Sequence, residues 1–259
     1  MAPAVSRGGR LTPTRMVAHC LLVEGDAGLT LVDTGFGTAD IAGGSKRLGP
    51  PFVALMRPAL DPAETAAAQV RALGFGVDDV TDIVLTHLDV DHAGGLADFP
   101  QARVHVFGDE LAAARARRSP KEKGRYLRAQ WQHDPRWVEH AVAGDAWRGF
   151  ESIRTVGEDV LLVPLRGHTR GHCAVAVRRP AGGWFLHAGD AYFFHGEKHQ
   201  PPSCPSGLRI FQTLVQMDKT ARLANQERLR SFHAEHGAEV TMFSAHDAVE
   251  FDALAGETG

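Results

Sequence analysis

The sequence has little of what marks a secreted, membrane-bound or nucleic-acid-binding protein. Its three cysteines, Cys20, Cys173 and Cys204, are too few and too far apart for a disulfide framework, which favours a reducing, cytoplasmic environment. No run approaches about 18 apolar residues and the first residues hold no apolar signal segment, so we expect neither a membrane span nor secretion. Lysine and arginine (28) nearly balance aspartate and glutamate (31), and the net charge of −3 gives no general attraction to nucleic acid.

What the sequence does have is an ordinary globular composition with many histidines. Of its 259 residues, 44% are hydrophobic and 23% are charged, which is enough apolar material for a large core. The 14 histidines are a high number, so their placement carries most of the information about function. No linker composition or short repeat divides the chain, and we therefore expect a single domain over residues 1–259.

Apolar runs between turn residues predict two β-rich halves, each followed by helices. The first half has expected strands at 16–24, 29–33, 82–86 and 103–107, a Gly/Pro-rich loop at 35–60, and helices at 61–74 and 109–140. The second half has expected strands at 153–156, 160–165, 173–179, 184–188 and 239–244, and one long helix at 208–236. This order predicts an α/β fold in which two sheets form a sandwich with helices outside.

The most informative segment runs from residue 86 to residue 95 and follows the apolar run 83–85. It holds His87, Asp89, Asp91 and His92, and the odd-numbered three would point to one side of an extended chain. A buried strand that leads into a loop of metal-ligand side chains is typical of a metal-assisted active site. The alternative is a polar loop whose side chains hydrogen-bond to their own backbone.

Other residues that can bind metal also follow apolar strands. The sequence Gly-His-Thr-Arg-Gly-His at 167–172 follows the strand that ends at Leu165. Asp190 and His246 follow two later strands, and Asp33 closes the first hairpin. One such position would mean little, but five in this order at the ends of strands indicate a shared site.

On these motifs the chain resembles the metallo-β-lactamase superfamily from Asp33 to His246. The resemblance implies an α/β fold of the αββα sandwich type, with two mixed sheets flanked by helices and two divalent metal ions along one edge. Asp190 would bridge the ions, and Asp33 and His172 would orient ligating imidazoles. The metal ligands implied in this sequence are His87, Asp89, Asp91, His92, His168, Asp190 and His246.

Asp89 stands where the superfamily usually has a histidine. With Asp91 and Asp190 it gives the site three carboxylates in place of two. The family implies zinc, but the additional hard ligand favours iron or manganese. The alternative is that Asp89 turns away from the metal toward a neighbouring side chain.

The resemblance is nearest to the quorum-quenching N-acyl homoserine lactonases, through residues 32–35, 92–95 and 245–247. It implies a metal-dependent hydrolase in which a metal-bridging hydroxide opens an ester or lactone bond of a small molecule. Asp91 and Asp190 would act in catalysis.

Two aromatic features near these motifs bear on the substrate. Those lactonases have a tyrosine three residues after the bridging aspartate, where this chain has Phe193. Tyr192 is a candidate for polarising a substrate oxygen, with simple packing as the alternative. Phe52, Leu55 and Met56 are candidates for an apolar lid, and ordinary packing is again the alternative.

Other functions stay open on the same residues. They are hydrolysis of a phosphoester or phosphotriester, a flavodiiron-like oxidoreductase, and a sensor without catalysis. The flavodiiron proteins have a glutamate at the position of Asp89, but no flavin-binding domain follows here.

The partners expected from the sequence are few. The basic, aromatic-containing stretch 115–128 would suit either a nucleic-acid surface or a solvated helix, and the negative net charge favours the helix. We expect a small-molecule substrate, no nucleic-acid or membrane partner, and a homodimer as one candidate oligomer.

Overall fold

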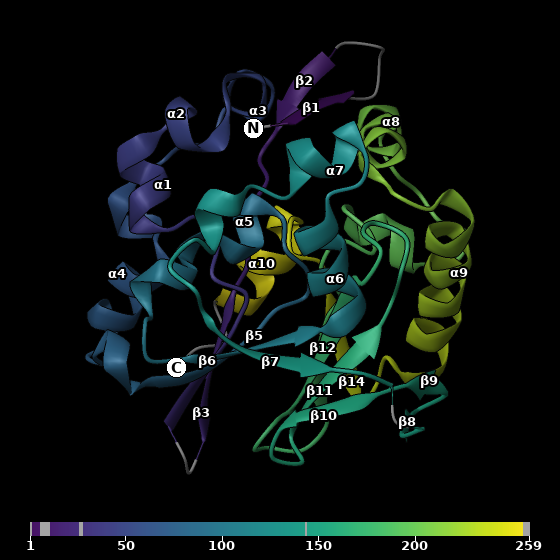
Figure 1. The fold of residues 1–259 in the computed structure, drawn as a ribbon. Coiled ribbons are helices and arrows are strands. Elements are labelled where there is room, and N and C mark those ends of the chain that lie inside the picture. The colour runs from purple at the N-terminus through teal and green to yellow at the C-terminus, as the bar shows by residue number, and fades with distance from the viewer. Residues whose placement is uncertain (1, 6–10, 26–27, 143, 256–259) are drawn as a thin grey trace. The chain divides into compact units, whose positions relative to one another are not determined.

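The computed structural model describes residues 2–5, 11–25, 28–142 and 144–255. The chain divides into two compact units, which we call the first unit (Cys20–Val142) and the second unit (Met1–His19 with Ala143–Gly259). Each contains a five-stranded sheet and several helices (Figure 1). A single domain over residues 1–259 stays a prediction. Among the described residues, no helix is long and apolar enough to cross a membrane.

The sheet of the first unit has the order β3-β4-β5-β6-β7 (Figure 1). Its strands are β3 (Leu21–Gly25), β4 (Gly28–Val32), β5 (Val80–Val84), β6 (Arg103–Phe107) and β7 (Arg136–His140). The strands β3 and β4 form an antiparallel hairpin, and the other neighbours are parallel. Because the carboxyl ends of parallel strands lie at one edge, the residues that follow β4 and β5 become neighbours.

Helices fill the connections between these parallel strands. They are α1 (Thr38–Gly43), α2 (Ser45–Leu48), α3 (Pro50–Met56), α4 (Ala66–Ala72), α5 (Val90–Ala93), α6 (Gly108–Ala116) and α7 (Pro120–Arg125). Ile83 and Val104 of the sheet share one buried cluster with Val70 of α4 and Leu111 of α6. This apolar contact holds the helices on the sheet and keeps the polar loops at its edge.

The second unit has a sheet of the order β10-β11-β12-β13-β14. Its strands are β10 (Ile153–Val156), β11 (Val160–Pro164), β12 (Cys173–Arg178), β13 (Trp184–His187) and β14 (Val240–Phe243). Only β13 and β14 are parallel, and the other neighbours are antiparallel. Two short hairpins, β1 (Ala2–Val5) with β2 (Leu11–Thr14) and β8 (Ala146–Trp147) with β9 (Phe150–Glu151), lie outside this sheet.

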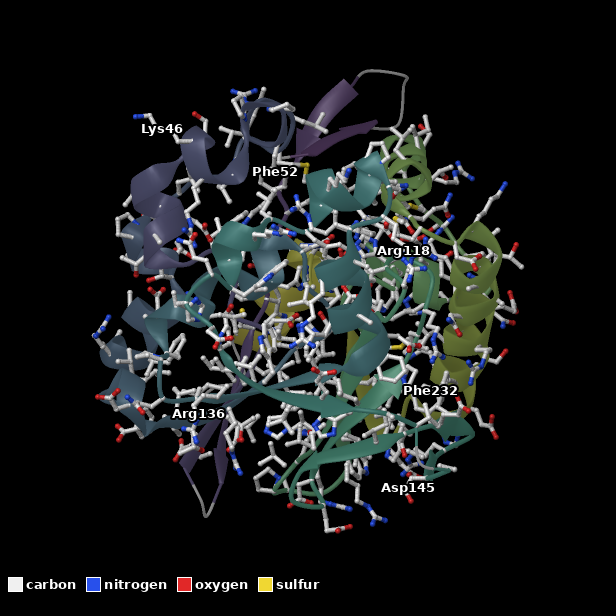
Figure 2. The ribbon with its side chains drawn as sticks, viewed as in Figure 1. Lys46, Phe52, Arg118, Arg136, Asp145 and Phe232 are labelled. Carbon is white, nitrogen blue, oxygen red and sulfur yellow. The ribbon has the colours of Figure 1, made fainter. Side chains whose placement is uncertain are left out.

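Three helices accompany this sheet: α8 (Ser206–Val215), α9 (Lys219–His236) and α10 (Ala248–Ala255). Leu229 and Phe232 of α9 share a buried cluster with Leu186 and Met242 of the sheet. Phe232, labelled in Figure 2, meets Phe150 edge to face with ring centroids 5.4 Å apart. These contacts fix α9 beside the strands that lead to Asp190 and His246.

The α/β fold with sheets flanked by helices is confirmed, but the expected loop at 35–60 is wrong. That segment forms α1, α2 and α3. Gly44 and Gly49 have positive φ angles of 49° and 89° and separate one short helix from the next. The helix expected at 61–74 is shorter, because the Thr65 side chain caps α4 by accepting a hydrogen bond from the Ala68 N–H.

Two other expected helices are also wrong. The segment 109–140 is interrupted between α6 and α7 and has only a short 3-10 helix after α7, and its last residues form β7, which pairs with β6. The long helix at 208–236 is interrupted between α8 and α9, where the Asp218 side chain caps α9 by accepting from the Ala221 N–H. Asp218 was readable as a cap in the sequence, but β7 depends on pairing with a distant strand.

The strand expected at 16–24 is shorter than predicted, and the difference matters for the second unit. Only residues 21–25 join β4. The preceding residues lie along 245–247 instead, with hydrogen bonds from Val17 N–H to His246 O (3.4 Å) and from His19 N–H to Ala245 O (2.9 Å). The other strands, including β6 at 103–107, agree with the sequence to within about two residues at each end.

Gly167, directly before His168, generates a stability prediction. Its φ of +142° disfavours any side chain, and a Cβ atom there would lie 2.5 Å from the backbone of Arg222 in α9. We expect Gly167→Ala to cost about 1–2 kcal/mol through backbone strain and a further 1–3 kcal/mol through overpacking, in rough terms. Gly157→Ala is the matched control, because Gly157 has a φ of +59° but open space around it. Urea unfolding of both metal-free variants measures the difference, and equal losses would contradict the proposed close contact with α9.

Candidate functional site

The metal-ligand segment of the first unit follows β5 and leads into α5. Asp89 is the N-cap of α5, and its carbonyl oxygen accepts hydrogen bonds from the N–H groups of His92 (3.0 Å) and Ala93 (2.9 Å). His87 and His92 are buried, with exposed fractions of 0% and 1%. Asp89 has an extended backbone (φ −72°, ψ 156°), whereas Asp91 and His92 lie in the first turn of a short helix.

The carboxylate of Asp33 orients this segment from the end of β4. Its Oδ1 accepts the Thr86 N–H and its Oδ2 accepts the Thr86 hydroxyl, both at 2.8 Å. The Thr86 oxygen lies 2.9 Å from Nδ1 of His87, and Oδ2 of Asp33 lies 2.8 Å from Nδ1 of His92. These acceptors place the proton of each ring on Nδ1, which makes Nε2 the atom that can bind a metal ion. Asp33 thus orients the His92 imidazole, as expected.

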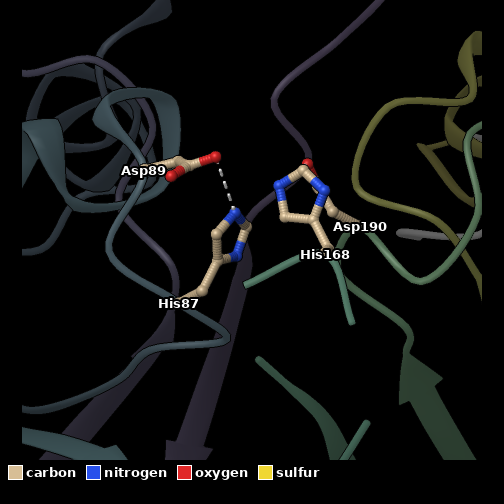
Figure 3. A group of neighbouring side chains, drawn as sticks. All are labelled: His87, Asp89, His168 and Asp190. Atoms are coloured by element: carbon tan, nitrogen blue, oxygen red, sulfur yellow. Dashed lines mark ion pairs between the residues drawn. The ribbon is translucent and has the colours of Figure 1, made fainter. Parts of the chain in front are cut away.

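Carboxylates lie on the Nε2 side of both rings. Oδ2 of Asp89 is 3.4 Å from Nε2 of His87 (Figure 3). Oδ1 of Asp91 is 3.9 Å from Nε2 of His92. The first unit therefore brings together all four of the residues that the sequence motif predicted for it.

In the second unit, Asp190 lies between two imidazoles. Its Oδ2 is 3.2 Å from Nε2 of His168, and its Oδ1 is 3.1 Å from Nε2 of His246. Nδ1 of His246 donates to the carbonyl oxygen of Val17 at 2.7 Å, so its Nε2 also carries the lone pair. Figure 3 shows His168 and Asp190 as side chains of this group.

His172 acts on this group in a way that the sequence did not predict. Its Nε2 accepts the backbone N–H of Asp190 at 2.9 Å, and its Nδ1 donates to the Leu165 carbonyl at 3.0 Å. His172 therefore fixes the backbone of Asp190, whereas we expected it to orient a ligating imidazole. The tight loop from 167 to 172 makes this contact possible and could not be read from residue types.

The donor atoms of both units suit divalent metal ions. Within the first unit, His87 with Asp89 and Asp91 with His92 each offer donor atoms within 4.8 Å, as do His168 and Asp190 in the second. Imidazole nitrogen and carboxylate oxygen are ligands for zinc, iron and manganese. Rings whose Nδ1 atoms are fixed by hydrogen bonds, next to buried carboxylates, are the arrangement that metal ligands require.

Asp89 also contacts a neighbouring side chain, as in the alternative in which it turns away from the metal. Its Oδ2 accepts a hydrogen bond from Nη1 of Arg125 at 2.7 Å, and the two side chains are only 17% and 7% exposed. Glu110 of α6 holds the same loop, because its Oε1 accepts the Leu88 N–H at 3.0 Å. Sequence reasoning missed both residues, and no spacing pattern would have found them.

The basic stretch 115–128 is therefore not one solvated helix. Arg115 pairs with Glu139 at the surface, with both side chains about half exposed, whereas Arg125 is buried against Asp89. A capping box between Ser119 and Glu122 starts a separate helix, α7, within the stretch. Part of its positive charge thus serves contacts within the first unit.

Tyr192 is buried in the core of the second unit. Its hydroxyl lies 3.1 Å from both carboxylate oxygens of Glu250 and donates to that side chain. Burial and the charge of Glu250 raise the pKa of Tyr192 well above its ordinary value. These contacts favour packing over the expected role in polarising a substrate oxygen. Phe193 instead stacks on His246, with ring centroids 5.1 Å apart and planes 16° apart.

Comparison with known proteins agrees with this fold. Residues 13–235 match the Metallo-beta-lactamase superfamily, and the chain belongs to this superfamily. A probable metallo-hydrolase of Mycobacterium tuberculosis is 44% identical over 236 residues, which cover 90% of this chain and 75% of that protein. The family and this relative show that the protein is an enzyme, a metallo-hydrolase.

Lactonases are also similar to this chain. The N-acyl homoserine lactonase AiiB of Agrobacterium fabrum is 26% identical over 201 residues, which cover 73% of this chain and 65% of that protein. The solved structure of an N-acyl homoserine lactone hydrolase, with the product N-hexanoyl-L-homoserine at its catalytic metal centre, matches with a TM-score of 0.69. The match covers 94% of this chain and 87% of that chain at 21% identity, which shows a common fold.

The contacts of Asp33 predict an effect on metal binding. Asp33→Asn keeps the left-handed backbone conformation, with φ of 56°, that asparagine tolerates. We expect it to weaken the affinity for zinc about 10–100-fold, because the anionic acceptor for His92 is lost. Calorimetric titration of metal-free protein measures this, with the exposed cap residue Asp61→Asn as the control. An unchanged affinity in Asp33→Asn would contradict the orienting role.

The contact of Tyr192 predicts an effect on stability instead of turnover. Tyr192→Phe removes a donor from buried Glu250 and should lower the free energy of unfolding by about 1–3 kcal/mol. The turnover number should fall by much less than the roughly 10²–10³-fold expected for a lost oxyanion donor. Urea unfolding and steady-state kinetics of one preparation test both statements. A loss of turnover number on that scale with unchanged stability would show that Tyr192 takes part in the reaction.

Proposed function

We propose that this metallo-hydrolase opens a lactone or ester bond of a small molecule. The observation that carries the proposal is the Asp190 carboxylate with an imidazole Nε2 on each side, which suits a ligand shared by two metal ions. The N-acyl homoserine lactonase of Agrobacterium fabrum, a relative by sequence, supports a cyclic ester as the substrate class.

The proposed ligands are those that the sequence motifs predicted. His87, Asp89 and His168 would hold one divalent ion, Asp91, His92 and His246 a second, and Asp190 both. Zinc is the family's metal, and iron or manganese remain candidates because of Asp89. When bound, such ions lower the pKa of water to about 7 and polarise a carbonyl oxygen.

The residues of this chain would perform the remaining tasks. Asp33 and Thr86 keep the protons of His87 and His92 on Nδ1, so both rings stay oriented through the reaction. The Asp91 side chain, 19% exposed, is our candidate for accepting a hydrogen bond from the attacking water. His172 holds the backbone of Asp190 and so limits movement of the shared carboxylate.

The proposed substrate has an apolar part. Phe193 presents an aromatic face without a hydroxyl to His246, where the similar lactonases have a tyrosine, so it can exclude water but cannot donate to the substrate. In the first unit, Leu55 of α3 is 54% exposed and Phe52 lies 6.1 Å from Phe36, measured between ring centroids. An exposed apolar helix of this kind suits the lid role. A cytoplasmic location, a homodimer and the absence of nucleic-acid and membrane partners stay predictions.

The reaction is tested with Asp190→Asn. We expect hydrolysis of N-acyl homoserine lactones and aryl esters by metal-replete protein to fall by at least about 10²-fold, because even the loss of an outer contact costs 10–100-fold. Asp252→Asn is the control, since that carboxylate is 59% exposed and pairs only at the surface with Arg15. Turnover of a phosphotriester or a phosphodiester, or an O₂-dependent reaction, with no ester or lactone hydrolysed, would contradict the carbonyl assignment.

A further inference from the structure

Asp89 and Arg125 form a partly buried ion pair beside the metal-ligand segment. The Nη1–Oδ2 distance is 2.7 Å, and the same Oδ2 lies 3.4 Å from Nε2 of His87 (Figure 3). One carboxylate oxygen is therefore within reach of both a proposed metal ligand and a permanent cation. Arginine keeps its charge at every physiological pH, so this neighbour cannot be titrated away.

Both partners of the pair are held in place by other contacts. Asp89 caps α5, and its carbonyl accepts the first hydrogen bonds of that helix. Arg125 is the last residue of α7, which a capping box between Ser119 and Glu122 starts. The backbone at both ends of the pair is therefore fixed within the first unit.

Arg125 offsets the negative charge that Asp89 adds. Asp89 replaces a neutral histidine of the family pattern and adds one negative charge to a site already rich in carboxylates. Without a metal ion, a carboxylate that is only 17% exposed is stabilised by a counter-charge, and Arg125 supplies one. With a metal ion, the guanidinium repels the incoming cation and shares the oxygen that the cation would bind.

We propose that Arg125 is an internal counter-cation for Asp89, which stabilises the metal-free ligand segment and lowers its affinity for divalent metal. Asp89 and Arg125 together carry no net charge, and the neutral histidine of the family pattern carries none either. The pair therefore has the same net charge as the residue that it replaces. The inference rests on the proposed function, because it takes His87 and Asp89 as metal ligands. Arg125 is a positioning residue that acts through Asp89.

The direction of the change in metal affinity tests this proposal. In metal-free protein titrated with zinc ions alone, Arg125→Gln should tighten binding at least about tenfold, because an opposing charge is removed. Arg125→Lys keeps the charge and should bind within about threefold of the parent protein. Loss of a merely structural contact would weaken binding, so unchanged or weaker binding in Arg125→Gln overturns the proposal.

Asp89→Asn completes the cycle. It leaves the guanidinium without its carboxylate and should weaken zinc binding, and Asp89→Asn/Arg125→Gln should bind at least about tenfold more tightly than Asp89→Asn. In urea unfolding of the metal-free proteins, each single change should destabilise more than the double change, because only a single change removes one charge of this partly buried pair and keeps the other. If Arg125→Gln does not fold, the comparison of Asp89→Asn with the double variant still decides the sign. Strictly additive losses of stability overturn the pairing.

Arg103→Gln is the matched control. Arg103 pairs with buried Asp82 at 2.8 Å, but it begins β6, at the edge of the sheet opposite to the ligand segment. We expect lower stability and unchanged zinc affinity, and an equal tightening there would overturn a specific role of Arg125. If the parent protein hydrolyses lactones but Arg125→Gln does not bind zinc more tightly, this inference is refuted and the proposed reaction stands. The expected affinity pattern without hydrolysis refutes only the proposed reaction.

Discussion

The position of the ring protons on the histidines is the constraint on which the candidate site depends. An imidazole can bind a metal through Nε2 only if its proton is on Nδ1, and a hydrogen-bond acceptor must hold it there. Thr86 and Asp33 supply the acceptors for His87 and His92, and the carbonyl of Val17 supplies one for His246. Strand β4 pairs in parallel with β5, and residues 16–19 lie along residues 245–247. These two arrangements bring the acceptors to the distances that the hydrogen bonds need.

Carboxylates beside the imidazoles are the second requirement, and the two units meet it in different ways. Asp190 lies between two imidazoles, whereas Asp89 lies between an imidazole and the guanidinium of Arg125. The charge that Asp89 adds to the ligand set is thus offset within the first unit, whereas its character as a hard oxygen ligand is unchanged. Charge balance around a site includes the neighbouring cations as well as the ligands.

Two adjacent aromatic residues, Tyr192 and Phe193, contact different parts of the second unit. Tyr192 points into the core and donates to Glu250, and Phe193 stacks on His246. A buried hydroxyl needs a partner, and Glu250 satisfies it away from the ligands. Tyr192 therefore does not take the place of the tyrosine that the resemblance to lactonases implies three residues after Asp190, and Phe193 gives His246 an apolar neighbour.

The sequence by itself determined the family, the candidate ligand residues within each unit and most strands, because these depend on residue type, on alternation and on position after apolar runs. It placed β6 at 103–107 correctly and paired Asp33 with the histidine motif. The tertiary structure decided which distant groups meet. Strand β7, the partner of Tyr192 and the ion pair of Asp89 with Arg125, 36 residues away, all follow from the path of the backbone. Ion pairs and strand partners of this kind leave no periodic signal, because the energy that selects them exists only once the chain is packed.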